Sequence, residues 1–366
     1  MNVTYIIGNG FDLNLGLKTS YKDFYEYYIE QYPCIIDEVE DENEKEIVKL
    51  KKSIQDSING KNTDKANWAD LELALGQYTS VFSAESEEKK NIAKKMMLSI
   101  LDDIEKKLTA YLKKVEDQIQ VSDSDSDYGE IVVELGNIEA HLTENNRASL
   151  RVHFGTNFNP PTHINIITLN YTSTIERLLN KQEEEQFMIP TRDLFGMSTG
   201  FETIHHLHNS LNGEYPILIG VNDESQIANE TLREDDTLKE FLIKPVTNVM
   251  FGTGVDRACE QIIGSSHLII LFGVSMGATD KYWWNLIASR LLKESSSRLV
   301  IFAYDQTFSN QRKMMGEKRR ELTNKFLSHS ELSKDEENLI KGRIIVEFNK
   351  SLFNGLRNFI KVVDPA

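Results

Sequence analysis

The stretch that decides the fold is Val3-Thr4-Tyr5-Ile6-Ile7-Gly8-Asn9-Gly10-Phe11-Asp12, in which a short β-rich run ends in a glycine turn. The run at residues 3–7 predicts a buried strand that opens the fold. After the turn, Thr19 or Ser20 is placed to cap a helix that continues to Ile29. A strand, a glycine turn and a helix in this order predict the start of an α/β fold.

Between about residues 35 and 150 the spacing of apolar residues is helical. One stripe recurs at every fourth residue, and a second has helical spacing. Their members are Ile92, Met96, Ile100, Ile104, Leu108 and Leu112 in the first and Trp68, Leu71, Leu75 and Tyr78 in the second. The acidic stretch Val121–Asp127 predicts a solvated loop between helices. We therefore expect a helical insertion between the first and second strands.

Strand patterns return in the second half of the chain and alternate with helical ones. The predicted strands are Ile164–Leu169, Thr203–Leu207, Tyr215–Ile219, His267–Phe272, Leu299–Tyr304 and Ile344–Phe348, with helices at Gly254–Ile263 and Lys281–Leu292 among them. Such alternation implies right-handed crossovers. The predicted class is α/β and Rossmann-like, with a mainly parallel sheet flanked by helices. The predicted core is residues 1–34 and 151–366, and residues 35–150 form the helical insertion.

Composition limits the function classes. The chain has 366 residues, 40% hydrophobic and 27% charged, as in globular proteins, and its formal net charge of −16 disfavours nucleic-acid binding. Cys34 and Cys259 form no CxxC pair, which fits a reducing cytoplasm and gives no zinc ribbon. No signal-peptide pattern and no apolar run of about 20 residues is present, so we expect a cytoplasmic protein without a membrane span.

Two strand-end blocks have the residues of a nucleotide site. In Gly8-Asn9-Gly10, the absence of side chains on the glycines would let backbone N–H groups approach a phosphate. An ordinary tight turn is the alternative. In Thr168–Glu176, Asn170 follows an apolar strand, and ligands of parallel sheets bind at the carboxyl ends of strands. Thr172 or Ser173 is equally suited to cap the following helix.

A histidine cluster follows at Ile204–Leu211, which contains three of the eight histidines. On a strand, His206 and His208 would share one face and His205 would take the other. Histidine is the natural general base near neutral pH. Structural or surface histidines are the alternative, and a metal site would need further ligands that the sequence does not place.

The last block, Gly273-Val274-Ser275-Met276-Gly277, again follows an apolar strand, and Asp280 is near. Its small residues would let the ribose of a nucleotide approach the backbone. Its G-x-S-x-G spelling also matches the nucleophile turn of serine hydrolases, for which Asp305 and His329 are candidate partners.

Taken in order, these blocks resemble the AbiH family of bacterial abortive-infection proteins, which act against phage. The stretches that carry the resemblance are Ile6–Asp12 with Gly16-Leu17 and Thr19–Phe24, Asn67–Glu72, Asn170-Tyr171-Thr172, His206-Leu207-His208, and Gly273–Met276 with Asp280. They span most of the chain.

The same blocks look like a remote version of the sirtuin-like NAD-binding fold. That likeness implies catalytic roles for Asn170, at the ribose, and His208, as general base. The residues it implies for binding the nucleotide are Gly8, Asn9, Gly10, Asp12, His206, Gly273, Ser275 and Asp280, with Asp305 near the adenosine. Asp12 stands in place of a serine, Thr172 in place of an acid, and Asn209 in place of the glycine after the histidine.

The resemblance implies an anti-phage effector that binds NAD and hydrolyses it, releasing nicotinamide. Two cysteines cannot form the four-cysteine zinc module of protein deacylases, and no metal is implied. The alternatives are a nucleotide-sensing or partner-binding defence subunit without turnover, and a nucleic-acid-acting effector. The partners that this class suggests are NAD or a related adenine nucleotide, a phage-derived trigger, a toxin–antitoxin partner and a second copy of the chain.

Overall fold

The computed structural model describes residues 1–31, 45, 47–49, 68–121, 134–155, 162–179, 188–192, 198–305, 311–350, 352–358 and 360–362. Asn67 and most of the acidic stretch predicted as a loop, residues 122–127, lie outside these residues.

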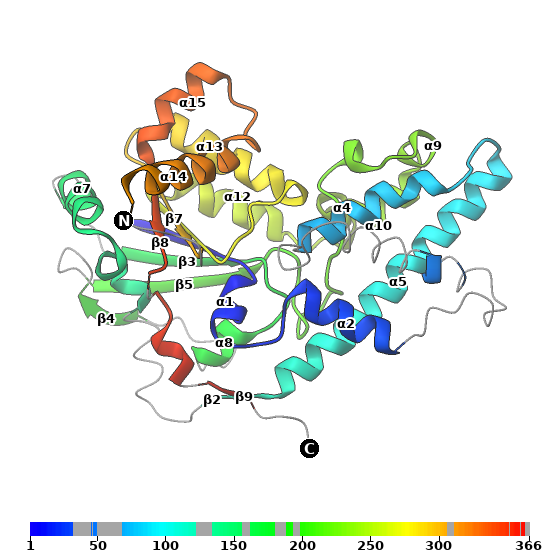
Figure 1. The fold of residues 1–366 in the computed structure, drawn as a ribbon, viewed down its shortest axis with the longest axis horizontal. Coiled ribbons are helices and arrows are strands. Elements are labelled where there is room, and N and C mark those ends of the chain that lie inside the picture. Colours follow the sequence, from blue (N-terminus) through cyan, green and yellow to red (C-terminus); the bar gives the residue numbers. More distant parts are fainter. Residues whose placement is uncertain are drawn as a thin grey trace.

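A seven-stranded sheet forms the centre of the fold (Figure 1). Its strands, in spatial order, are β4 (Met188–Arg192), β5 (Ser198–His206), β3 (Thr162–Thr168), β1 (Asn2–Ile7), β6 (Leu268–Phe272), β7 (Arg298–Ala303) and β8 (Ile344–Phe348). The six strands from β5 to β8 are parallel, and β4 is an antiparallel edge strand. The Rossmann-like α/β prediction is confirmed. After β1, the chain first adds β3, β4 and β5 on one side of β1 and then adds β6, β7 and β8 on the other side. The strand order therefore reverses at the β1–β6 pair.

Most of the predicted strands are present, but Tyr215–Ile219 is not a strand. This segment is irregular chain with Ile217–Ile219 buried, in which Leu218 N donates to His208 O and Pro216 O accepts from the Asn209 side chain. Proline has no N–H for a strand ladder, so the three apolar residues after Pro216 are buried in a loop and not in a strand. The predicted strand ending at Leu207 stops at His206.

Helices of varied length connect and cover the strands. The α-helices are α1 (Gly10–Asn14), α2 (Tyr21–Gln31), α4 (Trp68–Tyr78), α5 (Glu87–Asp117), α7 (Glu144–Gly155), α8 (Thr174–Leu178), α9 (Glu230–Arg233), α10 (Asp236–Leu242), α11 (Lys244–Phe251), α12 (Val255–Ser265), α13 (Lys281–Lys293), α14 (Arg312–Leu327) and α15 (Lys334–Ile340). The 3₁₀ turns are η3 (Thr79–Val81), η4 (Ile138–His141), η5 (Glu224–Gln226), η6 (Ala278–Asp280), η7 (Lys341–Arg343) and η8 (Gly355–Asn358). No helix among the described residues has the length and apolar character needed to cross a bilayer.

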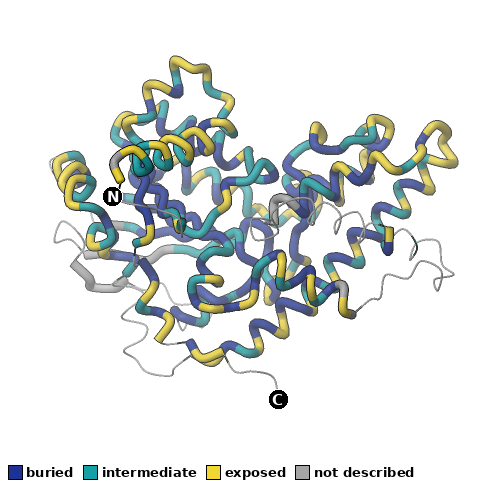
Figure 2. The backbone as a smooth tube through the Cα atoms, in the orientation of Figure 1, coloured by how far each residue is buried: buried dark blue, intermediate teal, exposed yellow. Residues whose placement is uncertain are grey.

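Both faces of the sheet are covered, as the buried strands in Figure 2 show. Tyr5 and Ile7 point into a core that includes residues of α2, α4, α5 and α7. Ile6, between them, points into a second core with residues of α12, α13, α14 and α15. Alternate residues of a strand face opposite sides, so an uninterrupted apolar run is what a strand buried on both sides requires.

The helical segment between β1 and β3 has the predicted helices, with one stripe displaced. Ser20 caps α2, since its hydroxyl accepts from Asp23 N and its own N–H donates to Asp23 Oδ2. In α5 the buried stripe starts at Ala93 and Met97, whereas Ile92 is 49% exposed. Residues spaced four apart are rotated by about 40° at each step around a helix of 3.6 residues per turn, so they cannot all lie on one face over 20 residues. Short β2 (Ile119–Val121) pairs with β9 (Ile360–Val362).

The turns after β1 and β6 lie backbone against backbone. Gly8 N donates to Phe272 O, and Gly10 N donates to Gly273 O, and both donor–acceptor distances are 2.9 Å. A Cβ on Gly10 would overlap the Cα of Gly273, and a Cβ on Gly273 would lie 2.7 Å from the backbone of Gly10. Gly273 also has φ +67°, which favours glycine. The glycines are therefore needed for the contact between the two turns.

Gly10→Ala is expected to destabilise the fold by about 1–3 kcal/mol, because the added methyl group forces the two turns apart. The matched control is Gly264→Ala in α12, where a Cβ would meet nothing within 4 Å. That change is expected to be neutral or stabilising by about 0.5–1 kcal/mol. Urea unfolding of both variants measures the difference, and equal losses would contradict the proposed contact.

Candidate functional site

A cavity of about 830 Å³ opens at the carboxyl ends of the central strands. This is the place where the strand order reverses, and such points are the usual ligand sites of open parallel sheets. Nine of the ten predicted site residues line it, namely Gly8, Asn9, Gly10, Asp12, Asn170, His208, Gly273, Ser275 and Asp280. His206 does not line it, and neither does Asp305, although the adjacent Tyr304 does.

Asp12 is buried in the wall of this cavity, at 1% exposure, on the short helix α1. Thr172 donates its hydroxyl to Asp12 Oδ2 over 2.6 Å, and Oδ1 has no hydrogen-bond partner among the described residues. Burial raises the pKa of Asp12 to about 7, against the opposing effect of the hydroxyl groups of Thr172 and Thr174 and the side chain of Asn170. This carboxyl group can therefore hold or release a proton near neutral pH.

Asn170 is also buried, at 5% exposure, just after β3. Its backbone N–H donates to Thr168 Oγ1, which holds the turn. Neither Oδ1 nor Nδ2 of its side chain has a hydrogen-bond partner within the described ranges. Each buried polar group left without a partner costs about 1–3 kcal/mol, so side chains in this state are expected where a ligand or water supplies the missing bonds.

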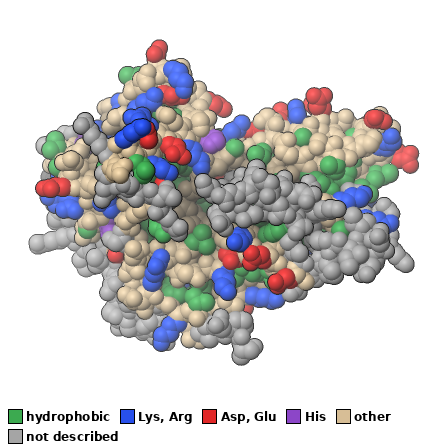
Figure 3. Space-filling model, in the orientation of Figure 1, with side chains coloured by type: hydrophobic (Ala, Val, Ile, Leu, Met, Phe, Trp, Pro, Cys, Tyr) green, Lys and Arg blue, Asp and Glu red, His purple; other side chains and the backbone are tan. Residues whose placement is uncertain are grey.

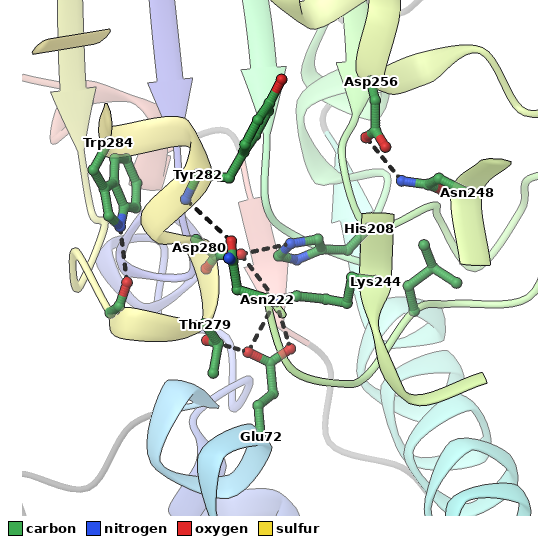
Figure 4. A network of polar contacts seen from close by, with 12 residues as sticks. Glu72, His208, Asn222, Lys244, Asn248, Asp256, Thr279, Asp280, Tyr282 and Trp284 are labelled. Atoms are coloured by element: carbon green, nitrogen blue, oxygen red, sulfur yellow. Dashed lines mark hydrogen bonds and ion pairs between the residues drawn. The ribbon is translucent and has the colours of Figure 1, made fainter. Parts of the chain in front are cut away.

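His208 belongs to a buried polar network shown in Figure 4. Its Nε2 lies 3.0 Å from Asp280 Oδ1, which also accepts from Lys244 Nζ over 2.8 Å. Lys244 Nζ contacts both carboxylate oxygens of Glu72 at 3.0 Å, and Thr279 donates to Glu72 Oε2. These contacts fix His208 against residues from α4, α11 and η6.

The charged groups of this network shift one another's pKa values. Although burial opposes ionisation, Lys244 and His208 keep the pKa of Asp280 well below its usual range. Burial raises the pKa of Glu72, against the attraction of Lys244. An ionised Asp280 accepts the N–H at Nε2 of His208. Nδ1 of His208 has no hydrogen bond among the described residues, so its lone pair is available as a base.

His206 has a different role from His208, and the prediction that the two share a strand face is wrong. β5 ends at His206, Leu207 and His208 form a turn, and Asn209 N donates to His206 O across it, so His208 does not continue the strand. His206 Nδ1 lies 2.9 Å from Asn170 O, and Nε2 lies 2.6 Å from Glu176 Oε1. Both neighbours are acceptors. Burial opposes the charge, but Glu176 raises the pKa of His206, so its ring is held as a cation that cannot serve as a base.

Ser275 lines the cavity but does not lie in a hydrolase nucleophile turn. The strained residue is its neighbour Met276, with φ +49°, and η6 follows in place of a helix that starts at the serine. Asp305, a candidate partner, binds Lys318 Nζ at 2.8 Å. The serine-hydrolase alternative has no support from this geometry.

Two members of the buried network were missed from the sequence. Glu72 was part of the stretch Asn67–Glu72 without a role, and Lys244 was not considered. Both are charged residues within helical patterns, where a solvated position is the usual outcome. Among the described residues, no group of three or more His, Cys, Asp or Glu is arranged to hold a metal ion.

A protein-family model described as bacteriophage abortive infection AbiH matches residues 4–303 of the chain. The match covers every strand-end block that lines the cavity up to Ala303. No curated protein matches the chain.

The buried Asp12 carboxyl predicts an unusual pH dependence of stability. Folding raises its pKa from 3.8 to about 7, so its contribution is fully present below pH 3.8 and is lost as the pH rises to about 7. The unfolding free energy of the wild type should fall relative to that of Asp12→Asn by up to about 4 kcal/mol over this window, at about 1.36 kcal/mol per pKa unit. Urea titrations between pH 4 and 8 measure it.

Asp235→Asn is a control for which the pH dependence of the unfolding free energy has the opposite sign. Although burial opposes ionisation, the Leu238 N–H and Lys94 lower the pKa of Asp235. Its contribution is therefore present above the unfolded pKa and is lost as the pH falls. A difference between wild type and Asp12→Asn that does not change with pH would show that Asp12 is not buried as described.

Proposed function

The chain belongs to the AbiH family of bacteriophage abortive infection proteins, and we propose that it acts in that defence by binding an NAD-type dinucleotide and cleaving the N-glycosidic bond to nicotinamide. Abortive infection stops phage spread by arresting or killing the infected cell, and depletion of a central cofactor has that effect. The site for this reaction is the cavity at the carboxyl ends of β1, β3 and β6.

One observation carries the proposal: Asp12, Asn170 and His208 line a single cavity with hydrogen-bonding atoms left over. Asp12 Oδ1 and both amide atoms of Asn170 are buried and unpartnered within the described part of the chain. A ribose presents hydroxyl groups that both donate and accept, which suits a carboxyl oxygen beside an amide. A volume of about 830 Å³ lies within the usual range for small-molecule and cofactor sites.

The charge of the inner cavity suits the reaction. As the C1′–N1 bond breaks, its electron pair stays on the nicotinamide nitrogen and positive charge develops on the ribose. Asp280 lines the cavity as a carboxylate paired with Lys244, and Asp12, whose pKa is about 7, is partly ionised near neutral pH. Fixed negative charge near a developing cation lowers the barrier most where water is excluded.

His208 and Asn170 complete the hydrolysis. Asn170 orients a water molecule toward C1′, and His208 Nδ1 accepts the proton that this water loses as its oxygen bonds to C1′. Asp280 holds the other ring nitrogen as N–H and stabilises the imidazolium that forms. The products are nicotinamide, ADP-ribose and one proton.

A second candidate is a nucleotide sensor without turnover. It is favoured by the contribution of Glu72, on α4, and Leu112, on α5, to the cavity wall. A bound nucleotide would therefore touch the helical segment between β1 and β3 and alter its surface for a partner. Nucleotide-dependent assembly without release of nicotinamide would select this function.

Purified protein is expected to release nicotinamide from NAD, and His208→Ala should lower the rate by at least about 100-fold, as for loss of a general base. The control is His267→Gln, because His267 lies at the amino end of β6, whereas the cavity lies at the carboxyl end of this strand. Chromatography of the products measures the rate. A wild type that neither binds nor cleaves NAD, alone or in extracts of infected cells, would rule the proposal out.

A further inference from the structure

We propose that the outer end of the cavity is a site for the phosphates and base of a nucleotide, formed by Lys325, Lys350 and Arg357 with Tyr304. This inference rests on the proposed function for the class of ligand, a nucleoside diphosphate or its derivative. It moves the phosphates away from the glycine turn, where the sequence places them.

Three of the backbone donors of the glycine turn are already in use. Gly8 N donates to Phe272 O, Gly10 N to Gly273 O, and Phe11 N to Gly8 O. A phosphate that took the N–H groups of Gly8 and Gly10 would have to break the hydrogen bonds that join the turn after β1 to the turn after β6. The glycines therefore build the floor of the cavity, and the N–H groups of Gly8, Gly10 and Phe11 are not available to an anion.

Three basic side chains from three separate elements supply other donors. Lys325 is on α14, Lys350 follows β8, and Arg357 is on η8, and all three line the cavity. No ion pair or side-chain hydrogen bond of Lys325 is found among the described residues. In a chain of net charge −16, the convergence of three cations on one cavity favours an anionic ligand.

Arg357 and Lys350 are positioned by contacts with neighbouring side chains and backbone, but these contacts do not fully neutralise their charges. Arg357 donates through Nε to Asn14 O and through Nη2 to Asn14 Oδ1, which are uncharged acceptors. Lys350 Nζ lies 3.6 Å from Glu347 Oε2, but Glu347 Oε1 accepts from Thr143 and Asn146. Both cations thus keep donors for a phosphate.

The rim of the cavity near Lys350 is a turn fixed by hydrogen bonds. Asn349, with φ +49°, accepts from Asp305 N and donates to Asp305 O, which ties the chain after β7 to the chain after β8. This pairing places Tyr304 and Lys350 at the same edge of the cavity. Tyr304 is 79% exposed, and an exposed aromatic ring beside cations suits stacking on a base.

The cavity is therefore polarised. Its buried residues Asp12 and Glu72 and its partly buried Asp280 are acidic, whereas its exposed residues Lys325 and Arg357 are basic. Elsewhere, on the described part of the face drawn in Figure 3, basic and acidic side chains are interspersed. A ligand with a cationic ring at one end and a diphosphate further along matches this polarity.

The test compares ADP with adenosine, since they differ only in the phosphates. The combined variant Lys325→Gln/Lys350→Gln/Arg357→Gln is expected to bind ADP at least about tenfold more weakly than the wild type, with a smaller salt dependence. Its affinity for adenosine should stay within about twofold. Tyr304→Ala should weaken the binding of both ligands. Titration calorimetry measures each affinity.

Lys313→Gln is the matched control, because Lys313 is on the same helix α14 but does not line the cavity. If the combined variant misfolds, Lys325→Gln alone still tests the inference, because the Lys325 side chain has no ion pair or hydrogen bond among the described residues to lose. Failure of the wild type to bind ADP, or unchanged ADP affinity in the combined variant, would overturn the inference. Binding of ADP without cleavage of NAD would instead count against the proposed function alone, because ADP contains no nicotinamide.

Discussion

The contact between the turn after β1 and the turn after β6 is the constraint on which the site depends. Gly8, Gly10 and Gly273 let the two backbones meet through direct hydrogen bonds. Their meeting closes the floor of the cavity and sets where α1 begins, and α1 in turn places Asp12 inside the wall. A side chain at any of these glycines would separate the turns and change the shape of the site before it touched a ligand.

The second determinant is the buried ammonium group of Lys244, which lies between two carboxylates. An isolated buried charge is costly, and the pairs with Glu72 and Asp280 offset that cost. The arrangement also leaves Asp280 ionised toward His208. His206, two residues earlier, is held as a cation by Glu176 and the backbone of Asn170. Two histidines from one short stretch thus have different hydrogen-bond partners, an ionised Asp280 for His208 and two acceptors for His206.

Local patterns were sufficient to predict the sheet and most of the cavity wall. Apolar runs that end in Gly8, Asn170 or Gly273 mark strand ends, and parallel strands bring those ends to one edge. The Glu72–Lys244 pair was not predictable, because its members are 172 residues apart and each resembles a solvated charge. The position of His208 depends on the turn that follows β5 and that Asn209 closes, and the absence of a strand at Tyr215–Ile219 is explained by Pro216. Such features are decided by tertiary contacts, which periodicity does not report.

Glu72 has a consequence for how this architecture can vary between relatives. It comes from the helical segment that precedes β3, yet it neutralises a lysine of the α/β core and borders the cavity. The segment is thus not an exchangeable module. A chimera that receives another protein's helices without an acid at this position would leave Lys244 with one counterion and would shift the electrostatic balance around His208. Glu72, Lys244 and Asp280 therefore have to be inherited as a set.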